Sequence, residues 1–210
     1  MTIHDLTILL NERTLPFLPG GDKPLAWTHD ADHETGPAQV STARIGSHLG
    51  THVDAPLHFI RGGRTTASMP LSSYVGTAAC LSAEGLVAGG AIRLEAILER
   101  DGRLLHEGDF LIVRTGYETL VGTEAYFDFP VFPENAGALL EARGIPALGM
   151  DTPSIGGIPE HRDVLGRGIA IFESLVNLAP LVGKRFFFSA APLKFEDGDG
   201  SPVRAYAVTE

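Results

Sequence analysis

Cysteine is almost absent from this chain: Cys80 is the only one in 210 residues, so no disulfide can form within the chain. Chains without disulfides are typical of reducing compartments. Residues 1–5 lack the basic and apolar segments of a secretory signal. No apolar run approaches the ~18 residues that a membrane-spanning helix needs. We therefore expect a cytoplasmic protein that has no membrane partner.

Positive charge is also scarce. The chain has 16 Lys and Arg against 26 Asp and Glu, which gives a formal net charge of −10 and a pI of about 5.2. Nucleic acids and anionic membranes bind proteins through cationic patches, so neither is expected as a partner. A small-molecule substrate is expected instead, and bound dications would offset the acidic charge locally enough to admit an anionic one.

Low-complexity tracts are absent as well. Charged residues make up only 20% of the chain and hydrophobic residues 44%, a composition typical of ordered globular proteins. The mass of 22.3 kDa is large enough for an extensive core. We expect a single domain over residues 1–210.

Short apolar segments alternate with helical ones, which predicts an α/β domain with a mixed β-sheet core and flanking helices. The expected strands are residues 5–10, 40–45, 78–81, 109–115, 146–150, 185–191 and 203–208, and the expected helices are 91–100 and 133–143. Residues 16–24 and 27–37 are rich in Pro, Gly and polar side chains and are expected to be loops. Asp151 directly follows a buried strand, which is a usual place for functional residues in α/β folds.

The segment with the clearest chemistry runs from residue 48 to residue 58 and reads His-Leu-Gly-Thr-His-Val-Asp-Ala-Pro-Leu-His. Imidazole nitrogen and carboxylate oxygen are ligands of zinc, and manganese becomes an alternative when carboxylates dominate. The cluster predicts a metal site, and a histidine-rich solvated loop is the less favoured interpretation. Its candidate residues are His48, His52, Asp54 and His58.

The spacing of these residues constrains how they can meet. In a strand that rises ~3.3 Å per residue, His48 and His52 would lie ~13 Å apart, too far to share an ion. We expect the chain to turn between them at Gly50, which tolerates unusual backbone angles. His52 and Asp54 lie on one face of a strand and can share an ion. The proline two residues after Asp54 directs His58 separately, as suits a general acid or base.

Two residues further along the chain add to this set. Glu173 lies in an otherwise apolar stretch, where an ionised carboxylate is costly unless it has a partner. A metal ion is one such partner and an arginine is the other. His161 lies beside Glu160 and Arg162, and taken alone it is more typical of a surface histidine.

Other candidate groups are weaker. His29 and His33 lie in the polar segment 27–37, where a solvated loop, a lid or a pocket wall is favoured over a second metal site. Phe127, Phe129 and Phe132 could line a pocket, but at this density they are expected in the core.

The segment 48–58 resembles the HxGTHxDxPxH signature of the cyclase family of metal-dependent hydrolases, which includes bacterial kynurenine formamidase, isatin hydrolase and a manganese-dependent dienelactone hydrolase. Residues 151–154, the pair His161 and Glu173, and residues 192–195 and 200–205 resemble further segments of that family. The resemblance spans about residues 5–208.

The resemblance implies a swivelling β/β/α fold, a homodimer or homotetramer, and two divalent ions per chain, with Zn²⁺ favoured and Mn²⁺ as the alternative. The implied ligands are His48, His52, Asp54, His161 and Glu173. Asp54 would bridge the ions, and Glu173 would contact both and count with His58 among the catalytic residues. His58 would donate or accept the proton.

The function expected from this set is hydrolysis of a carbon–nitrogen bond other than a peptide bond. We expect a metal-activated water to cleave an amide of a small aromatic or cyclic substrate, as an arylformamidase does, because departure of an amine depends most on the proton from His58. Isatin-type ring opening, lactone hydrolysis and a non-enzymatic structural or sensor site are the alternatives. Phe17 takes the place of a substrate-packing tryptophan of kynurenine formamidases and is expected to bind substrate. A covalent nucleophile is not expected, since Cys80 has an apolar context and no Gly-x-Ser-x-Gly elbow is present.

Overall fold

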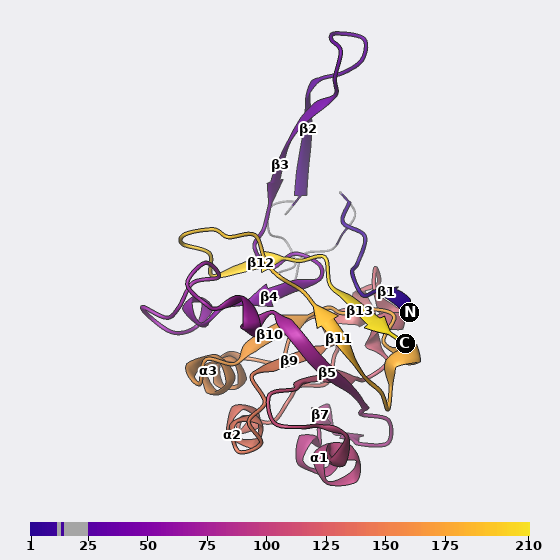
Figure 1. The fold of residues 1–210 in the computed structure, drawn as a ribbon, viewed down its shortest axis with the longest axis vertical. Helices are drawn as coiled ribbons and strands as arrows, with labels where there is room; N and C mark the ends of the chain where they lie inside the picture. The colour runs from indigo at the N-terminus through magenta and orange to yellow at the C-terminus, as the bar shows by residue number, and fades with distance from the viewer. Residues whose placement is uncertain (12–13, 15–24) are drawn as a thin grey trace.

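The computed structural model describes residues 1–11, 14 and 25–210, and Figure 1 shows their course. The α-helices are α1 (Leu94–Asp101), α2 (Ala136–Glu141) and α3 (Ile158–Gly166). The strands are β1 (Thr2–Asp5), β2 (Leu25–Ala31), β3 (Val40–Ile45), β4 (His52–Asp54), β5 (Val75–Ser82), β6 (Val87–Ala88), β7 (Ala91–Ile92), β8 (Phe110–Arg114), β9 (Ala147–Met150), β10 (Ala170–Glu173), β11 (Arg185–Ser189), β12 (Gly200–Pro202) and β13 (Tyr206–Thr209). None of the helices in the described part of the chain is long and apolar enough to cross a membrane.

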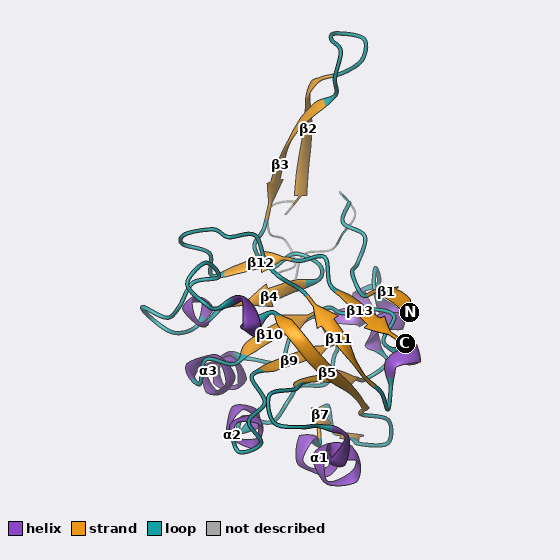
Figure 2. Cartoon of the chain, in the orientation of Figure 1, coloured by secondary structure: helices purple, strands orange, loops and turns teal. Residues whose placement is uncertain are grey.

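Nine of these strands form one mixed sheet in the order β1-β13-β11-β5-β8-β9-β10-β4-β12. The four central strands β5, β8, β9 and β10 run parallel, and the strands on both sides of them pair antiparallel. The three α-helices lie along one side of the sheet, as Figure 2 shows. The expected α/β class with a mixed sheet and flanking helices is confirmed.

The apolar run of β8 explains why the sheet is buried on both faces. Phe110 and Ile112 point into one core, whereas Leu111 and Val113 point into the other, where the helices pack. A strand that is covered on both faces needs apolar residues at every position rather than at alternate ones.

The sheet curls strongly around the first of these cores. Phe172 of β10 and Phe188 of β11 belong to strands that three others separate, yet their ring centroids lie only 5.2 Å apart in an edge-to-face contact. Such edge-to-face pairs stabilise cores beyond the area that they bury. The curl brings the β4 end of the sheet over this core, and β4 carries part of the metal motif.

Strands β2 and β3 form a separate two-stranded ribbon that projects from the body of the molecule, as Figure 1 shows; we call residues 25–45 the arm. The expectation of a loop over residues 27–37 is therefore wrong for its first part, because residues 25–31 pair with β3. Strand β3 has the bounds expected from sequence.

Several expected boundaries are also corrected. The first strand ends at Asp5 rather than at residue 10. Beyond it the chain leaves the sheet, and the N–H of Ile8 donates a hydrogen bond to the side chain of Thr51. The segment 203–208 is interrupted, since the N–H of Val203 bonds to the carbonyl of Thr51 between β12 and β13. Helices α1 and α2 are shorter than expected, and α3 was not expected at all.

Candidate metal centre

Strand β4 places two polar side chains in a buried position. His52 and Asp54 lie on one face of the strand, and Val53 between them points into the core. The Nε2 atom of His52 lies 3.3 Å from Oδ1 of Asp54. The pairing that sequence predicts for these two residues is therefore present in the structure.

Strand β10 adds Glu173 through its register with β4. Glu173 lies directly opposite His52 in this antiparallel pair, so the two side chains emerge on the same face. The Oε2 atom of Glu173 is 3.3 Å from Nε2 of His52. Its Oε1 atom accepts a hydrogen bond of 2.8 Å from the N–H of Ile155. Among the described residues no arginine pairs with Glu173, and His52 and His161 lie against it instead.

Helix α3 brings His161 to the same point. Its Nε2 atom lies 3.6 Å from Oδ2 of Asp54 and 3.5 Å from Oε1 of Glu173. The other ring nitrogen, Nδ1, is 2.6 Å from the carbonyl oxygen of Gly157, and the ring of Phe59 stacks on the imidazole. His161 is only 4% exposed, so it does not take the surface position that is typical of a histidine between charged neighbours.

The turn expected at Gly50 places His48 beside Asp54. Gly50 has a φ of +64°, a left-handed conformation that favours glycine. As a result, Nδ1 of His48 lies 2.7 Å from Oδ1 of Asp54. In an extended chain these two residues would be roughly 20 Å apart.

His58 lies at the edge of this group, beside His48. Ala55 is extended and Pro56–His58 form a single 3-10 turn, as expected from the proline. The imidazole of His58 stacks on that of His48 with 3.9 Å between ring centroids. Burial lowers the pKa of His58, which favours the neutral ring.

Asp199 is a residue that the sequence analysis missed. Its Oδ2 atom lies 3.0 Å from Nε2 of His48 and 3.6 Å from Nδ1 of His58. It sits in an acidic Asp-Gly-Asp-Gly segment that is typical of a solvated turn. The available signal was Gly200 after it, because glycine at the start of a strand indicates close approach of another group.

The charges of the group support one another. Burial alone would lower the pKa of His52, but hydrogen bonds and charge from Asp54 and Glu173 raise it to about 10. The pKa values of His48 and His161 are also raised against the effect of burial. Burial opposes ionisation of Asp54 and Glu173, yet the surrounding histidines hold both carboxyl pKa values below their usual range. Both carboxylates are therefore ionised.

The donor set fits a divalent metal. The Oδ2 atom of Asp54 is fully buried and accepts no hydrogen bond, which sets it apart from the other buried side-chain oxygens and nitrogens of the described residues. His52 and His161 direct Nε2 at carboxylates and tie Nδ1 to a backbone carbonyl, the arrangement by which proteins orient metal-binding histidines. Two overlapping groups have ligand atoms within 4.8 Å of one another: His48, Asp54 and His58, and His52, Asp54 and Glu173.

A cavity of about 410 Å³ opens beside His48 and His52. Its walls are largely apolar and include Ile8, Leu9, Val121, Phe127, Pro153 and Val176. The hydroxyl of Tyr126 donates to the side chain of Ser174 on the same wall. Phe132 is buried in the core as expected, whereas Phe127 faces the cavity and Phe129 is half-buried.

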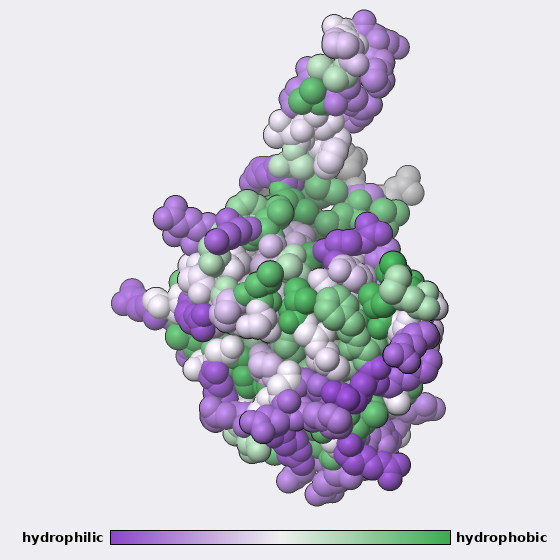
Figure 3. Space-filling model, viewed as in Figure 1, coloured by the Kyte–Doolittle hydropathy of each residue, from purple (hydrophilic) through white to green (hydrophobic). Residues whose placement is uncertain are grey.

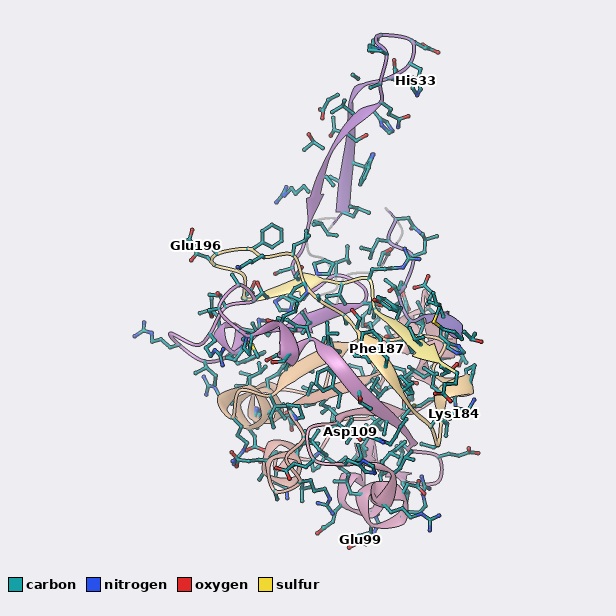
Figure 4. All side chains as sticks on the ribbon, viewed as in Figure 1. His33, Glu99, Asp109, Lys184, Phe187 and Glu196 are labelled. Atoms are coloured by element: carbon teal, nitrogen blue, oxygen red, sulfur yellow. The ribbon has the colours of Figure 1, made fainter. Side chains whose placement is uncertain are left out.

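Other candidate residues lie elsewhere. Asp151 directly follows β9, but its carboxylate accepts hydrogen bonds from the N–H groups of Thr115 and Gly116 and so anchors a turn. His33 lies at the tip of the arm, away from the sheet that carries the site, as Figure 4 shows. His29 lies on the exposed ribbon beside Ser41.

Cys80 is fully buried, and burial raises its pKa to about 12. Phe17 lies outside the described residues.

Comparison with known proteins gives a consistent result. The profile of the family described as "Putative cyclase" matches residues 4–156. A kynurenine formamidase from Salinibacter ruber is 32% identical over 199 residues, which cover 88% of each chain. A solved "predicted metal-dependent hydrolase" from Bacillus stearothermophilus is 27% identical with a TM-score of 0.80, over 98% of this chain and 97% of the other. Isatin hydrolase A from Labrenzia aggregata shares the fold with a TM-score of 0.83 at 23% identity, over 100% and 94%.

Proposed function

The chain belongs to the cyclase family, and we propose that it is a metal-dependent hydrolase that cleaves an amide C–N bond of a small aromatic or cyclic substrate. The observation that carries this proposal is the buried Oδ2 atom of Asp54, which accepts no hydrogen bond and has imidazoles and a second carboxylate around it and an apolar cavity beside the site. Buried carboxylates without hydrogen bonds are costly, and a bound cation removes that cost.

We propose that two divalent ions bind here, held by His48, His52, Asp54, His161 and Glu173, with Asp54 and Glu173 shared between them. Support for two ions comes from Asp54, whose Oδ1 atom lies near His48 and His52 and whose Oδ2 atom lies 3.6 Å from Nε2 of His161. Zinc suits the three imidazoles, and manganese is the alternative because two carboxylates take part. A bound divalent ion supplies a Lewis acid and acidifies water at neutral pH.

His58 is proposed to move the proton. Its Nδ1 atom faces Asp199, which leaves Nε2 as the atom available to a reacting group. Since burial lowers its pKa, the neutral ring predominates near pH 7 and can accept a proton before it passes that proton to the departing amine. Glu173 contributes to catalysis through its fixed orientation, because the N–H of Ile155 holds its Oε1 atom.

The cavity supports a compact, largely apolar substrate. Ile8, Val121 and Phe127 are among the apolar residues of its walls, and such walls favour a flat aromatic or cyclic molecule. The kynurenine formamidase relative suggests an aryl formamide, and the isatin hydrolase that shares the fold suggests a cyclic amide. Substrate packing on Phe17 stays a prediction. Hydrolysis of a lactone, which needs less help from a proton donor, is the second candidate.

A purely structural or sensory metal site is the non-enzymatic alternative. Structural zinc sites are usually closed by four ligands that include cysteine, whereas Cys80 lies in the core and the candidate ligands border an open cavity. These observations favour catalysis.

The test is metal analysis by mass spectrometry of the purified protein, with hydrolysis assays on N-formylkynurenine, isatin and a dienelactone after reconstitution with zinc or manganese. We expect two ions per chain and turnover of an amide. Turnover of the lactone alone would favour the second candidate. A chain that binds ions but hydrolyses none of the three would support the non-enzymatic site.

We also propose that the protein is a homo-oligomer that the arm helps to join. Among the described residues the two strands of the arm pair with each other and with no further strand, and two-stranded hairpins are marginally stable alone in water. Trp27 and Val40 on this ribbon are each 52% exposed. In Figure 3 the tip of the arm is hydrophilic, whereas hydrophobic residues gather where the arm meets the body. A second copy that covers the ribbon would bury these side chains.

A further inference from the structure

Asp199 contacts two histidines at once. Its Oδ2 atom lies 3.0 Å from Nε2 of His48 and 3.6 Å from Nδ1 of His58. The two imidazoles stack with 27° between their planes. The backbone of Asp199 is held as well, because its carbonyl accepts a 2.9 Å hydrogen bond from the N–H of Ala55, one residue after Asp54.

The distance of His58 from the other candidate ligands does not by itself tell whether it binds metal or transfers a proton. One ring nitrogen of His58, together with atoms of His48 and Asp54, belongs to a set of ligand atoms that all lie within 4.8 Å of one another. An imidazole so close to the metal group can serve as a ligand or as a proton donor, but not as both at once. Asp199 on the Nδ1 side of His58 and the stacked ring of His48 together fix where the His58 imidazole lies relative to the metal group.

His48 is oriented by the same carboxylate. Nδ1 of His48 faces Asp54, and Nε2 faces Asp199. Histidines that bind metal through one ring nitrogen commonly donate from the other to a carboxylate, which sets the tautomer and the ring orientation. Asp199 is 42% exposed at its side chain and lies behind the His48 ring, opposite the contact with Asp54.

We propose that Asp199 is a positioning residue that holds His58 out of the metal coordination sphere as a proton-transfer group and orients His48 as a ligand. The expected change in kcat rests on the proposed hydrolase function. The expected change in metal coordination can be measured without turnover. In this role Asp199 neither binds metal nor touches substrate.

The test compares Asp199→Asn with Asp197→Asn, a matched control in the same segment whose side chain is exposed. In the metal-loaded enzyme, we expect Asp199→Asn to lower kcat by ~10–100-fold, as loss of a carboxylate behind a metal-bound histidine commonly does. KM and the number of bound ions stay unchanged. Asp197→Asn behaves as the unmodified chain. A kcat for Asp199→Asn equal to that of the unmodified chain would overturn the proposal.

A double-mutant cycle with His58→Ala tests the route of the effect. If Asp199 acts mainly through His58, Asp199→Asn lowers kcat much less in the His58→Ala background than in the unmodified chain. An equal loss in both backgrounds would overturn the positioning of His58.

The visible spectrum of bound Co²⁺ gives a readout that needs no activity. We expect the spectrum of Asp199→Asn to change because the freed His58 joins the coordination sphere, and His58→Ala in that background to restore the original spectrum. An unchanged spectrum overturns this proposal alone. Failure of the unmodified chain to bind Co²⁺ overturns the proposed function and this proposal together, whereas a His58-dependent spectral change without turnover upholds the positioning and refutes only the hydrolase.

Discussion

Gly200 and His48 are close neighbours across the edge of the sheet: a Cβ atom on Gly200 would lie 2.5 Å from Cε1 of His48 and 2.9 Å from the carbonyl oxygen of Val53. Real Cβ atoms do not approach other atoms so closely. Gly200 therefore leaves the space in which the imidazole of His48 lies between Asp54 and Asp199.

Gly200→Ala is accordingly expected to displace His48 and weaken metal binding. Such overpacking typically costs ~1–3 kcal/mol of folding free energy. Metal titration of the metal-free protein, with thermal unfolding in parallel, measures both effects. Gly102→Ala is the control, because Gly102 has an ordinary helical conformation and only a 3.8 Å contact to Leu98. Equal metal affinity in both variants would contradict this role of Gly200.

His58→Ala is expected to separate metal binding from catalysis. Loss of a positioned proton donor should lower kcat by ~10²–10⁴-fold, while the metal content stays that of the unmodified chain. Steady-state kinetics on the amide substrate and mass spectrometry of the ions measure the two. His106→Ala removes an exposed histidine and should change neither. Unchanged turnover in His58→Ala would refute the role assigned to His58.

Metal binding should release protons. In the metal-free protein the pKa of His52 is raised to about 10, so its imidazole is protonated at pH 7, whereas a ligand nitrogen must be free of its proton. Affinity for zinc is therefore expected to rise with pH up to that pKa and to fall in acid. Calorimetric titrations in buffers of different ionisation enthalpy count the released protons. Heats that do not depend on the buffer would contradict this prediction.

The ion pair between buried Asp109 and exposed Arg185 is expected to make stability depend on pH in acid. Burial would raise the pKa of Asp109, but two hydrogen bonds from Arg185 and one from the N–H of His106 hold it below the ordinary value of 3.8. A lowered folded-state pKa stabilises the protein above pH ~4, and this contribution disappears as the pH falls through the folded-state pKa.

Asp109→Asn should cost about 1–2 kcal/mol at neutral pH and flatten the acid limb of the stability curve. Thermal unfolding between pH 2 and pH 7 measures this. Asp101→Asn, which breaks the exposed pair with Arg100, is the control and should cost less than about 1 kcal/mol. Equal losses in the two variants would argue against a special contribution from Asp109.

Trp27 reports on association of the arm, since it is the only tryptophan of the chain. It is 52% exposed in one copy, so its fluorescence emission should shift to shorter wavelength as the concentration rises and a second copy covers the arm. Light scattering gives the oligomeric state independently. Trp27→Ala should weaken association, while Leu71→Ala, which also truncates an exposed apolar side chain, should not. Emission that stays constant through the association transition would exclude the arm from the interface.

The sequence by itself was enough to identify the local part of the site. His48, His52 and Asp54 lie within seven residues, so the geometry of one turn and one strand was sufficient to predict their convergence. The turn at Gly50 and the extended Ala55 follow from the backbone preferences of glycine and of residues before proline. The apolar run around β8 likewise predicted a strand over residues 109–115.

Only the tertiary structure decided how the distant groups reach the site. The register of β10 against β4 places Glu173 opposite His52, and α3 turns His161 inward although its neighbours are charged. Asp199 reaches His48 across 151 residues of sequence because β12 pairs with β4. Sheet register and helix packing depend on contacts summed over the whole core, and for that reason no local pattern in the sequence specifies them.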